Sequence, residues 1–582
     1  MIPVRKAELC HEGFYGNKRL NNCCKTFYLC DNNPTNRHKT SIALTNPRGD
    51  IVKQQLFSRA LVALIAGLGL QTGMAQAPAQ SLTWSANLDA LSMDPHSTNN
   101  SFTNAFVSNI YEALVRFNDK LQIEPALATS WKVVSPTVWR FTLRQGVKFH
   151  NGETFDADDV VFSWQRVNTP GSLVKGNLSD IKDVRKVDAN TVDVETHNPM
   201  PILTNELVQL LVMDKGWSEA NRSTEASDLQ KQKENHANRN TNGTGPFMLK
   251  QRDVDTRTVL TAFAGWWDKP KHNLGEVTFM PIKSDATRTS ALISGSIDVS
   301  VSVPLQDVPR LQSSGVDVVQ GPELRTIFLG MDQHRDELLY SDVKGKNPFK
   351  DKRVRQAVYH AIDIEAIKRS VMRNASWPSG TLLSPYLNGA PNSLNKRLLP
   401  YDQAAAKKLL ADAGYPNGFT VGMQCPNDRY VYDEAICLAI SSMLARVGIK
   451  TNLTIEPTAR WSVRLNTNDV SFYIVGHAGL PMADSYGLLK DVVHTRTQRE
   501  GALNAGRYSN PKFDAYLPRI AAEIDAAKRN KLIEEAVALE REDISHVPLH
   551  QQPITWAARK GIQLAQAPDN QMRLWLVRAP AK

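Results

Sequence analysis

Apolar residues alternate with polar ones in some stretches of the chain and recur at helical spacing in others. Trp139, Phe141 and Leu143 alternate with polar residues and predict a half-buried strand. Residues 157–167 instead place their apolar side chains on one face of a helix, and Asp156 stands at the capping position before it. This succession of strand and helix patterns predicts an α/β fold.

The same helical spacing predicts helices over 353–362, 403–413 and 514–539, of which the second is capped by Asp402 and ended by Gly414. Residues 222–242 are polar and poorly periodic, which indicates a surface insertion. The sequence has no internal repeat of about 20–50 residues. It also has no long linker, so we expect two or three lobes joined by short, ordered crossings.

One long apolar run, residues 60–70, predicts export. Lys53 and Arg59 precede it, and Ala75-Gln76-Ala77 follows it with small residues at the positions that a signal peptidase reads. A run of about 11 residues is shorter than the roughly 20 that a transmembrane helix needs. We therefore expect a signal peptide over 52–77, removed after Ala77, with a buried core helix as the alternative. No cysteine stands at the cleavage point, so we expect no lipid anchor.

Residues 1–51 precede this signal and show no helical or strand period. We interpret them as a non-native upstream extension, with a long, unusual leader as the alternative. They also change the meaning of the net charge, which is +10 for the 582 residues and would suggest a nucleic-acid or membrane partner. Residues 1–77 hold ten Lys and Arg against four Asp and Glu, which leaves 59 basic and 55 acidic side chains, a net +4. With no basic stripe among aromatics, we expect no nucleic-acid partner.

Two of the six cysteines, Cys425 and Cys437, lie after the predicted signal peptide. The patterns predict a strand that ends near residue 424 and a helix over 433–447, so this pair would join the two across a short loop. In an oxidising compartment an isolated pair favours a disulfide, with two free buried thiols as the alternative. No histidine or further cysteine lies near by in sequence, so we expect no metal site there.

Motifs of common hydrolases and nucleotide-binding enzymes are missing from the sequence, which contains no G-x-S-x-G, H-E-x-x-H or G-x-x-x-x-G-K-[ST]. His546 and His550 are four residues apart, but Pro548 lies between them and prevents a shared helical face. We therefore expect no enzyme and no cofactor. An exported hydrolase is the alternative from another class.

Residues 127–167 read LATSW, then an alternating aromatic strand, LRQGVKFHNG and a helix with Ala157 and Asp159 before Val160. Other motifs stand at matching places along the chain: Met93-Asp94-Pro95-His96, Tyr111-Glu112-Ala113-Leu114, Gly243-Thr244-Gly245-Pro246-Phe247, Ser294-Gly295-Ser296-Ile297-Asp298, Asn347-Pro348-Phe349 with Arg353-Val354-Arg355-Gln356-Ala357, and Gly506-Arg507-Tyr508-Ser509-Asn510-Pro511. Together they resemble the peptide/nickel-binding family of solute-binding proteins of ABC importers, over nearly all of 81–582.

The resemblance implies a two-lobed periplasmic binding protein of type II, an α/β fold with hinge-joined mixed sheets and an extra subdomain. Residues 78–324 and 548–582 would form lobe 1, and residues 325–547 would form lobe 2. Two crossings, near Arg325–Asp332 and Val547–Gln551, would form the hinge. Such a protein closes around its solute, and the solute stabilises closure through contacts with both lobes.

The resemblance also places candidate ligand-binding residues. The segment after Asp94-Pro95-His96 lines the cleft, which points to Asn99 and Ser101. In lobe 2 the cleft is faced by the loop 476–484. Peptide-binding members carry there an aspartate that pairs with the peptide α-amine, whereas this chain has Leu480, which argues against a peptide held in that way.

Five further residues are candidates, and the first three have a structural role as the alternative. Asp484 is a charged anchor or the N-cap of a helix over 486–493. His477 contacts the ligand or is structural, and Arg325 pairs with a ligand carboxylate or between the lobes. Trp377 and Tyr508 are candidate apolar walls.

The function implied is that of a periplasmic binding component, in a Gram-negative bacterium, that captures a peptide or peptide-like small solute. An opine, a sugar or a nickel chelate is the alternative solute. The partners implied are an ABC permease and its ATPase, and we expect a monomer.

Overall fold

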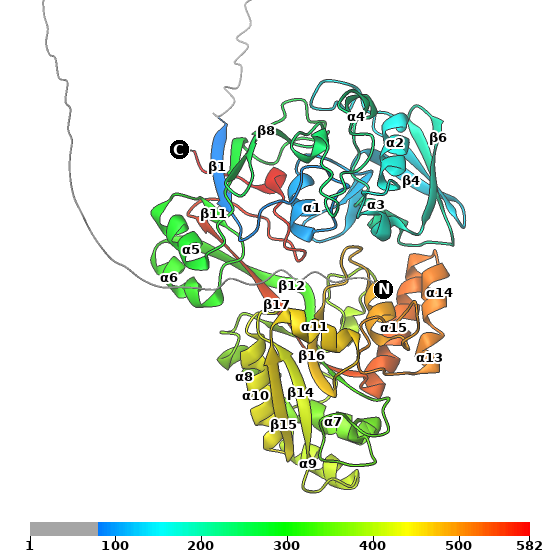
Figure 1. Ribbon diagram of the computed structural model, residues 1–582, viewed down its shortest axis with the longest axis vertical. Coiled ribbons are helices and arrows are strands. Elements are labelled where there is room, and N and C mark those ends of the chain that lie inside the picture. Colours follow the sequence, from blue (N-terminus) through cyan, green and yellow to red (C-terminus); the bar gives the residue numbers. More distant parts are fainter. Residues whose placement is uncertain (1–78, 582) are drawn as a thin grey trace, which may run out of the picture. The chain divides into compact units, whose positions relative to one another are not determined.

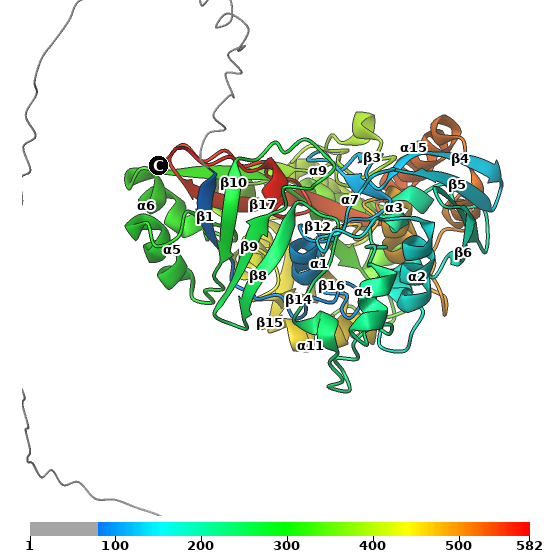
Figure 2. The same ribbon diagram turned by 90° about the horizontal axis from the view of Figure 1, so that it is seen from above.

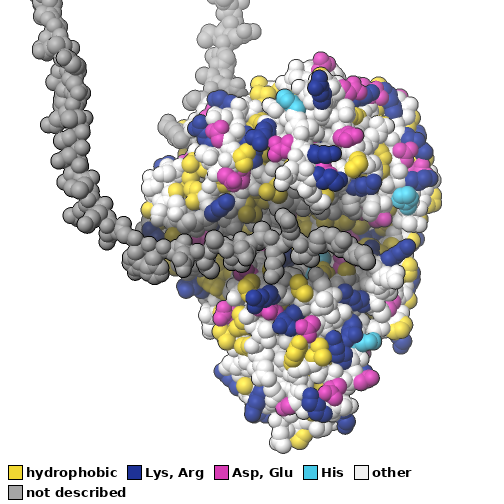
Figure 3. All heavy atoms as spheres, viewed as in Figure 1, with side chains coloured by type: hydrophobic (Ala, Val, Ile, Leu, Met, Phe, Trp, Pro, Cys, Tyr) yellow, Lys and Arg dark blue, Asp and Glu magenta, His cyan; other side chains and the backbone are white. Residues whose placement is uncertain are grey.

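The structure is a computed structural model that describes residues 79–581, so the predicted extension (1–51) and signal peptide (52–77) lie outside the described residues. These residues form two lobes with separate apolar cores (Figure 1). One core consists of buried apolar residues between 324 and 549, together with Leu121 and Ala567. The others are built from residues 82–316 and 554–579. On the face seen in Figure 3, acidic and basic side chains are interspersed over both lobes.

A mixed sheet of eleven strands runs through both lobes. In spatial order its strands are β15 (Ile449–Glu456), β14 (Phe419–Pro426), β16 (Phe472–His477), β12 (Val316–Met331), β17 (His546–Arg559), β11 (Val299–Ser300), β1 (Gln80–Ser85), β10 (Leu274–Phe279), β9 (Arg257–Ala262) and β8 (Phe247–Asp253), with β13 (Trp377–Pro378) paired to β17. The long strands β12 and β17 pair antiparallel and pass from one lobe into the other (Figures 1 and 2). They therefore lie where the sequence predicts the hinge crossings.

A smaller sheet forms a subdomain with its own core in the first lobe. Its antiparallel strands are β4 (Ala128–Ser135), β5 (Val138–Leu143), β7 (Thr191–Thr196) and β6 (Ile181–Asp188), and the hairpin β2 (Val115–Phe117) and β3 (Ile123–Pro125) lies before them in the chain. The helix α2 (Ala157–Val167) starts at a capping box. The Asp156 side chain accepts a hydrogen bond from the backbone of Asp159, and the Asp159 side chain accepts one from the backbone of Asp156. The predicted strand and helix are both confirmed.

The remaining helices flank these sheets. They are α1 (Ser101–Val107), α3 (Leu203–Leu207), α4 (Lys215–Ala220), α5 (Asp285–Ser294), α6 (Val308–Ser313), α7 (Lys352–Ala361), α8 (Ile364–Ser370), α9 (Gln403–Asp412), α10 (Asp433–Ala445), α11 (Thr458–Asn466), α12 (Ser485–Leu488), α13 (Pro511–Asp514), α14 (Leu517–Ala522) and α15 (Ala526–Asp543). The predicted α7 and α9 are confirmed, including the Asp402 cap. Among residues 79–581, none of the helices has the length and apolar character needed to cross a membrane.

The single helix predicted over 514–539 is wrong, because the chain forms three helices there. Pro518 lies in the first turn of α14, where its missing N–H costs no intrahelical bond. Asp525 then caps α15 by accepting a hydrogen bond from the backbone of Lys528. Both residues start a new helix rather than continue an old one.

The polar segment 222–242 is anchored to the interior and is not a simple surface insertion. The buried Arg166 guanidinium donates to the backbone carbonyls of Ser223 and Glu225, at 2.8 and 2.9 Å. The backbone N–H of Ser227 donates to the buried Asp94 carboxylate at 3.0 Å. The backbone of this segment therefore supplies hydrogen-bond partners to the buried Asp94 and Arg166.

A disulfide joins Cys425 on β14 to Cys437 on α10, so the predicted pairing is confirmed. Both cysteines are buried in the core of the second lobe. The loop that it closes is short, with a sequence separation of 12. Loop entropy alone gives a stabilisation of about 3 kcal/mol for a closed loop of this size.

Gly243 and Gly245 let the chain pass close to the backbone of Ile110. A Cβ atom at Gly243 would lie 2.0 Å from the Ile110 carbonyl oxygen, and one at Gly245 would lie 2.7 Å from the same carbonyl. Any side chain at these two positions would displace the backbone. The glycines therefore support the segment that begins at Tyr111 and lines the cavity described next.

Candidate functional site

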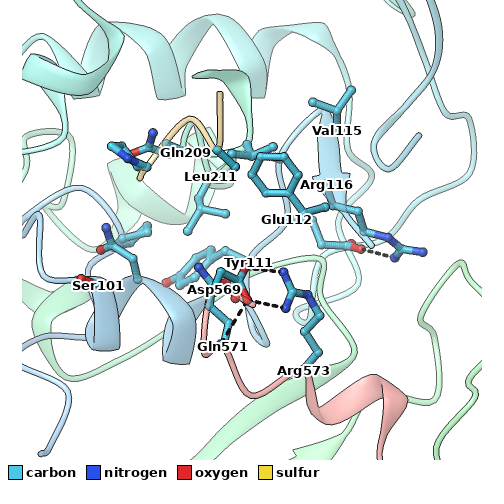
Figure 4. Close-up of a pocket in the computed structure, with 18 of the residues that line it drawn as sticks. Ser101, Tyr111, Glu112, Val115, Arg116, Gln209, Leu211, Asp569, Gln571 and Arg573 are labelled. Atoms are coloured by element: carbon cyan, nitrogen blue, oxygen red, sulfur yellow. Dashed lines mark hydrogen bonds and ion pairs between the residues drawn. The ribbon is translucent and has the colours of Figure 1, made fainter. Parts of the chain in front are cut away.

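A cavity of about 350 Å³ lies between the first lobe and a loop of the second. First-lobe residues reach it from α1, from residues 111–117, from residues 208–211 after α3, and from the C-terminal residues 569–575 (Figure 4). The second lobe contributes Leu480, Pro481 and Ala483, which follow β16. A molecule in this cavity would therefore contact both lobes at once.

Local capping and one buried amide set the position of the first-lobe wall. The Asn100 side chain caps α1 by accepting a hydrogen bond from the backbone of Thr103 at 3.0 Å. At the other end of α1, the buried Asn109 side chain accepts from the backbone of Leu574 at 2.9 Å and donates to the Met572 carbonyl at 3.2 Å. The C-terminal segment is thus held beside α1, which brings its side chains to the cavity.

Glu112 is a buried carboxyl on the wall, and neutral donors surround it. Its oxygens accept hydrogen bonds from the Thr244 hydroxyl at 2.9 Å and from the indole N–H groups of Trp267 and Trp266 at 2.9 and 3.2 Å. Burial raises the pKa of Glu112, and these hydrogen bonds and Arg116 oppose the rise. The carboxyl is fixed by the protein itself.

Two further charged groups on the wall are paired as well. Arg116 donates to Glu124 and to Asp268, each at 2.7 Å. Arg573 makes a bidentate pair with Asp569, at 3.0 and 2.7 Å (Figure 4). Burial alone would lower the pKa of Arg116, but its hydrogen bonds to Asp268 and Glu124 raise it above the ordinary value. These pairs shape the wall without leaving a free charge on either partner.

Neutral amides line another part of the wall. Asn177 donates from Nδ2 to the Asn99 Oδ1 at 2.7 Å and to the Gln209 Oε1 at 2.6 Å. The Nε2 of Gln209 and the Oδ1 of Asn104 are buried and have no hydrogen-bond partner among the described residues. Both residues line the cavity, and each carries one buried polar atom without a partner.

The lobes also meet beside this cavity. Asn205 on α3 donates to the Met482 carbonyl at 2.8 Å, which is a direct bond from the first lobe to the loop that faces it. A second cavity, of about 1050 Å³, lies next to this contact and is lined by residues 119–123, 319–322, 385–389 and 564–568. The boundary between the lobes is therefore hollow over more than one stretch.

Glu206, which follows Asn205, supplies a pH-dependent prediction. It is buried, and its Oε2 has no hydrogen-bond partner among the described residues. Burial, with repulsion from Asp180 added and attraction to Lys490 opposing, raises its pKa from 4.5 to about 9. The folded state therefore holds this proton more tightly than the unfolded chain does. Its contribution to stability is fully present below pH 4.5 and is lost as the pH rises through 9.

We expect Glu206→Gln to weaken the loss of stability between pH 5 and 9. At pH 9 its melting temperature should exceed that of the wild type by about 2 °C or more, whereas at pH 5 the two should agree. Thermal melts at a series of pH values measure this. Glu219→Gln, which changes an exposed side chain on α4, is the control and should follow the wild type. Parallel curves for the wild type and Glu206→Gln would refute the assignment.

The structure brings two of the seven candidate ligand-binding residues, Asn99 and Ser101, to the cavity. Ser101 is the first residue of α1, and Asn99 lies just before its cap. Both are exposed, so they are reachable from solvent. The prediction that the segment after Asp94-Pro95-His96 provides a wall agrees with this placement.

Arg325 and His477 lie side by side at the crossing strands rather than on this cavity. Arg325 lies 3.4 Å from the Glu323 carboxylate and donates to the Gly476 carbonyl at 3.4 Å. The His477 Nδ1 accepts a hydrogen bond from the backbone of Gly479 at 3.0 Å. Burial, and then the nearby Arg325, lowers the pKa of His477 to about 4, so the ring is neutral at pH 7.

The other three candidates have structural partners. Trp377 lies in β13, opposite Gln551 of β17. Tyr508 is buried, and its hydroxyl donates to Asp543 at 2.7 Å. Asp484 caps α12, as one of the two interpretations predicts, and forms a bidentate pair with Arg529 at 2.9 and 2.8 Å. None of the three is among the residues that line the cavity.

The sequence prediction of ligand-binding residues does not include Gln209, Glu112, Trp266, Trp575 or the Asp569–Arg573 pair, although Glu112 belongs to one of the family motifs. A usable signal existed for the first two, since each is a polar residue inside an otherwise apolar run. The acid and the base at spacing i, i+4 near the C-terminus were a further signal. Within residues 79–581, no group of three His, Cys, Asp or Glu side chains is placed to hold a metal ion.

Comparisons with known proteins agree with this architecture. A sequence model described as bacterial extracellular solute-binding proteins, family 5, middle part, matches residues 122–498. The periplasmic murein peptide-binding protein MppA of Escherichia coli (strain K12) is 24% identical over 475 residues, which cover 76% of this chain and 82% of that protein. Heme-binding protein A of Haemophilus influenzae is 26% identical over 476 residues, 77% of this chain and 82% of that one. The solved structure of HbpA2 from Haemophilus parasuis, 24% identical, covers 86% of this chain and 99% of its own with a TM-score of 0.73, which shows a shared fold.

Proposed function

Because the chain belongs to the bacterial extracellular solute-binding proteins of family 5, we propose that it captures a peptide or peptide-like small solute between its two lobes. In this proposal it then delivers the solute to the membrane permease of an ABC importer. The fold predicted from the sequence, a two-lobed α/β binding protein with an added subdomain, is confirmed by the likeness to solved structures.

The observation that carries the proposal is the cavity whose walls come from both lobes. Two long strands, β12 and β17, pass between the lobes, so small changes along them would rotate one lobe against the other. A solute that touches α1 on one side and residues 480–483 on the other gains contacts only when the lobes are together. Its binding energy is therefore coupled to closure.

The solute class is taken from the cavity and from the relatives together. Relatives are named for a murein peptide, for glutathione and for heme, so the shared fold accepts chemically different small molecules. The present cavity combines amides with apolar walls, which suits a peptide-like molecule. An opine, a sugar or a nickel chelate is the second candidate class. The family consists of binding proteins, and the proposal includes no catalytic step.

The proposal extends to the oligomeric state, the compartment and the partners of the protein. The protein acts as a monomer in the periplasm, after removal of its signal peptide, and docks transiently on the permease that its ATPase drives. The interspersed charges seen in Figure 3 support this setting better than a nucleic-acid partner does, because they give that face no stripe of one sign.

The test is to identify what the protein retains. Protein purified from its natural host is denatured, and the released small molecules are identified by mass spectrometry. The same compound, added back at about 100 times its dissociation constant, should stabilise the folded state by about 2.7 kcal/mol, seen as a higher melting temperature. The compound should be recovered unchanged. Steady release of product from a peptide, without any stabilisation, would refute a binding protein in favour of the exported hydrolase.

A further inference from the structure

The charged side chains that line the cavity between the lobes are all satisfied by the protein itself. They are Glu112, Arg116, Asp569 and Arg573. Glu112 accepts hydrogen bonds from three side chains, and Arg573 donates two hydrogen bonds to Asp569. Arg116 is shared between Glu124 and Asp268. No charged group of this wall, as far as the structure describes it, is left to pair with a charge on a solute.

A charged solute group would therefore lose its hydration on entry without gaining an ion pair. Such a loss is large for an ammonium or a carboxylate group and small for a group without charge. The second-lobe residues that face α1 here, Leu480, Pro481 and Ala483, are apolar and offer no charge either. Lobe closure would bring this apolar surface against the solute, which makes the cavity selective against charge.

The amide groups on the wall, in contrast, favour uncharged polar groups on the solute. Gln209 cannot turn freely, because its Oε1 accepts a hydrogen bond from Asn177 at 2.6 Å. Asn177 is itself held by a reciprocal amide pair with Asn99, at 2.7 and 3.2 Å. The Gln209 Nε2 is a buried donor without a partner, and the Asn104 Oδ1 is a buried acceptor without one. A buried donor and acceptor left unpaired cost free energy that a solute carbonyl and N–H would recover.

We infer that this cavity selects a solute that is uncharged where it enters, with an amide-like carbonyl and N–H and an apolar body. The carbonyl accepts from Gln209, and the N–H donates to Asn104. The apolar body lies against the aromatic and aliphatic wall formed by Phe117, Leu121, Trp266, Leu480 and Trp575. This inference rests on the proposed function, because it assumes that this cavity is where the solute binds.

The experiment is a matched set of four ligands with the same side chains. The Leu-Phe dipeptide is offered as the N-acetyl amide (uncharged), the methyl ester (cation), the N-acetyl acid (anion) and the free dipeptide (zwitterion), and titration calorimetry measures each dissociation constant. We expect the uncharged compound to bind at least about tenfold more tightly than each of the others. Equal or tighter binding of a charged compound, or no binding of the uncharged one at millimolar concentration, overturns the inference.

A substitution tests the donor directly. Gln209→Glu keeps the acceptor that Asn177 uses but replaces the Nε2 donor by an unpaired carboxylate oxygen. We expect its affinity for the uncharged ligand to fall at least about tenfold, with the cationic ester gaining relative to it. Gln251→Glu makes the same chemical change at an exposed position of β8 and should leave both affinities within twofold. Melting curves without ligand check that each variant is folded.

The two proposals fail in different ways. If the solute that the natural protein retains is charged and fills this cavity, the proposed function stands and the selection against charge is wrong. If Gln209→Glu binds the uncharged ligand as tightly as the wild type does, the assigned donor is wrong. If the retained compound is turned over, the proposed function itself fails, whatever the charge of that compound.

Discussion

Replacement of Arg166 by methionine is expected to lower the free energy of unfolding by about 3–5 kcal/mol, because it leaves a buried carboxylate without its partner. Arg166 and Asp94 are both fully shielded from solvent and make two hydrogen bonds of 2.7 Å. Burial alone would raise the pKa of Asp94, but Arg166 brings it below the ordinary value. Methionine fills much of the same volume, so the loss measures the polar contacts of Arg166, with Asp94 first among them, and not an empty space.

The expected effect reaches the candidate site. Pro95, directly after Asp94, and Asn99, five residues after it, both line the cavity. Arg166 also donates to the backbone carbonyls of Ser223 and Glu225, so the anchored segment 222–242 would lose these two attachments. Chemical unfolding followed by circular dichroism measures the stability, and calorimetry with the retained solute measures the affinity. We expect both to fall.

Arg140→Met is the matched control. Arg140 makes the same bidentate arrangement with Asp193, at 2.7 and 2.8 Å, but on the surface of the β4–β7 sheet. Surface pairs contribute about 0–1 kcal/mol, so this variant should stay close to the wild type. If Arg166→Met lost no more stability than Arg140→Met, the buried pair would not have the role assigned to it.

The Asp94–Arg166 pair also marks the limit of what the sequence predicts. Local patterns identified β5, α2 and α9 and their caps, because periodicity and capping depend on neighbours within a few residues. The two partners of the pair lie 72 residues apart, and nothing in either local pattern marks the contact. The polar segment 222–242 looked like a surface insertion for the same reason, since its buried partners belong to other parts of the chain.

The helix predicted over 514–539 failed for a different reason. The apolar spacing continued through this stretch, but Pro518 and Asp525 both carry the signal of a helix start. Weighing those two residues above the spacing would have divided the stretch correctly. The boundaries of these helices are therefore marked in the sequence by local start signals.

The residues of the candidate site also fall into two groups, those that a local motif predicts and those that depend on distant partners. Asn99 and Ser101 were placed through a motif, and both line the cavity. Gln209 owes its orientation to Asn177, which is 32 residues away, and Glu112 owes its donors to residues more than 130 positions away. Such partners are set by tertiary packing, which periodicity does not report. The sequence leaves the role of Asp484 open for the same reason. Its partner Arg529 lies 45 residues away, and no local pattern marks their contact.

Asp484→Asn is expected to destabilise the protein by about 3–5 kcal/mol while leaving the dissociation constant of the retained solute within about twofold. The substitution preserves the helix cap, since asparagine also accepts from the backbone of Tyr486, but it removes the charge that Arg529 needs. Arg529 is buried and makes two hydrogen bonds to this carboxylate, at 2.9 and 2.8 Å, while its Nε donates to the Ile520 carbonyl at 3.2 Å. An uncompensated buried guanidinium is therefore the source of the loss. Chemical unfolding and calorimetry on the same preparation separate the two quantities.

Asp351→Asn serves as the control because it makes the same change in an exposed setting. Asp351 caps α7 through the backbone of Arg353 at 2.8 Å and pairs with the Arg353 guanidinium at 2.6 Å, and half of the Arg353 side chain is exposed. Its loss should stay below about 1 kcal/mol. A solute anchor would behave in the opposite way, since Asp484→Asn would then weaken binding by a hundredfold or more and change stability little. That result would return Asp484 to the binding site and would also contradict the selection against charge inferred for the cavity.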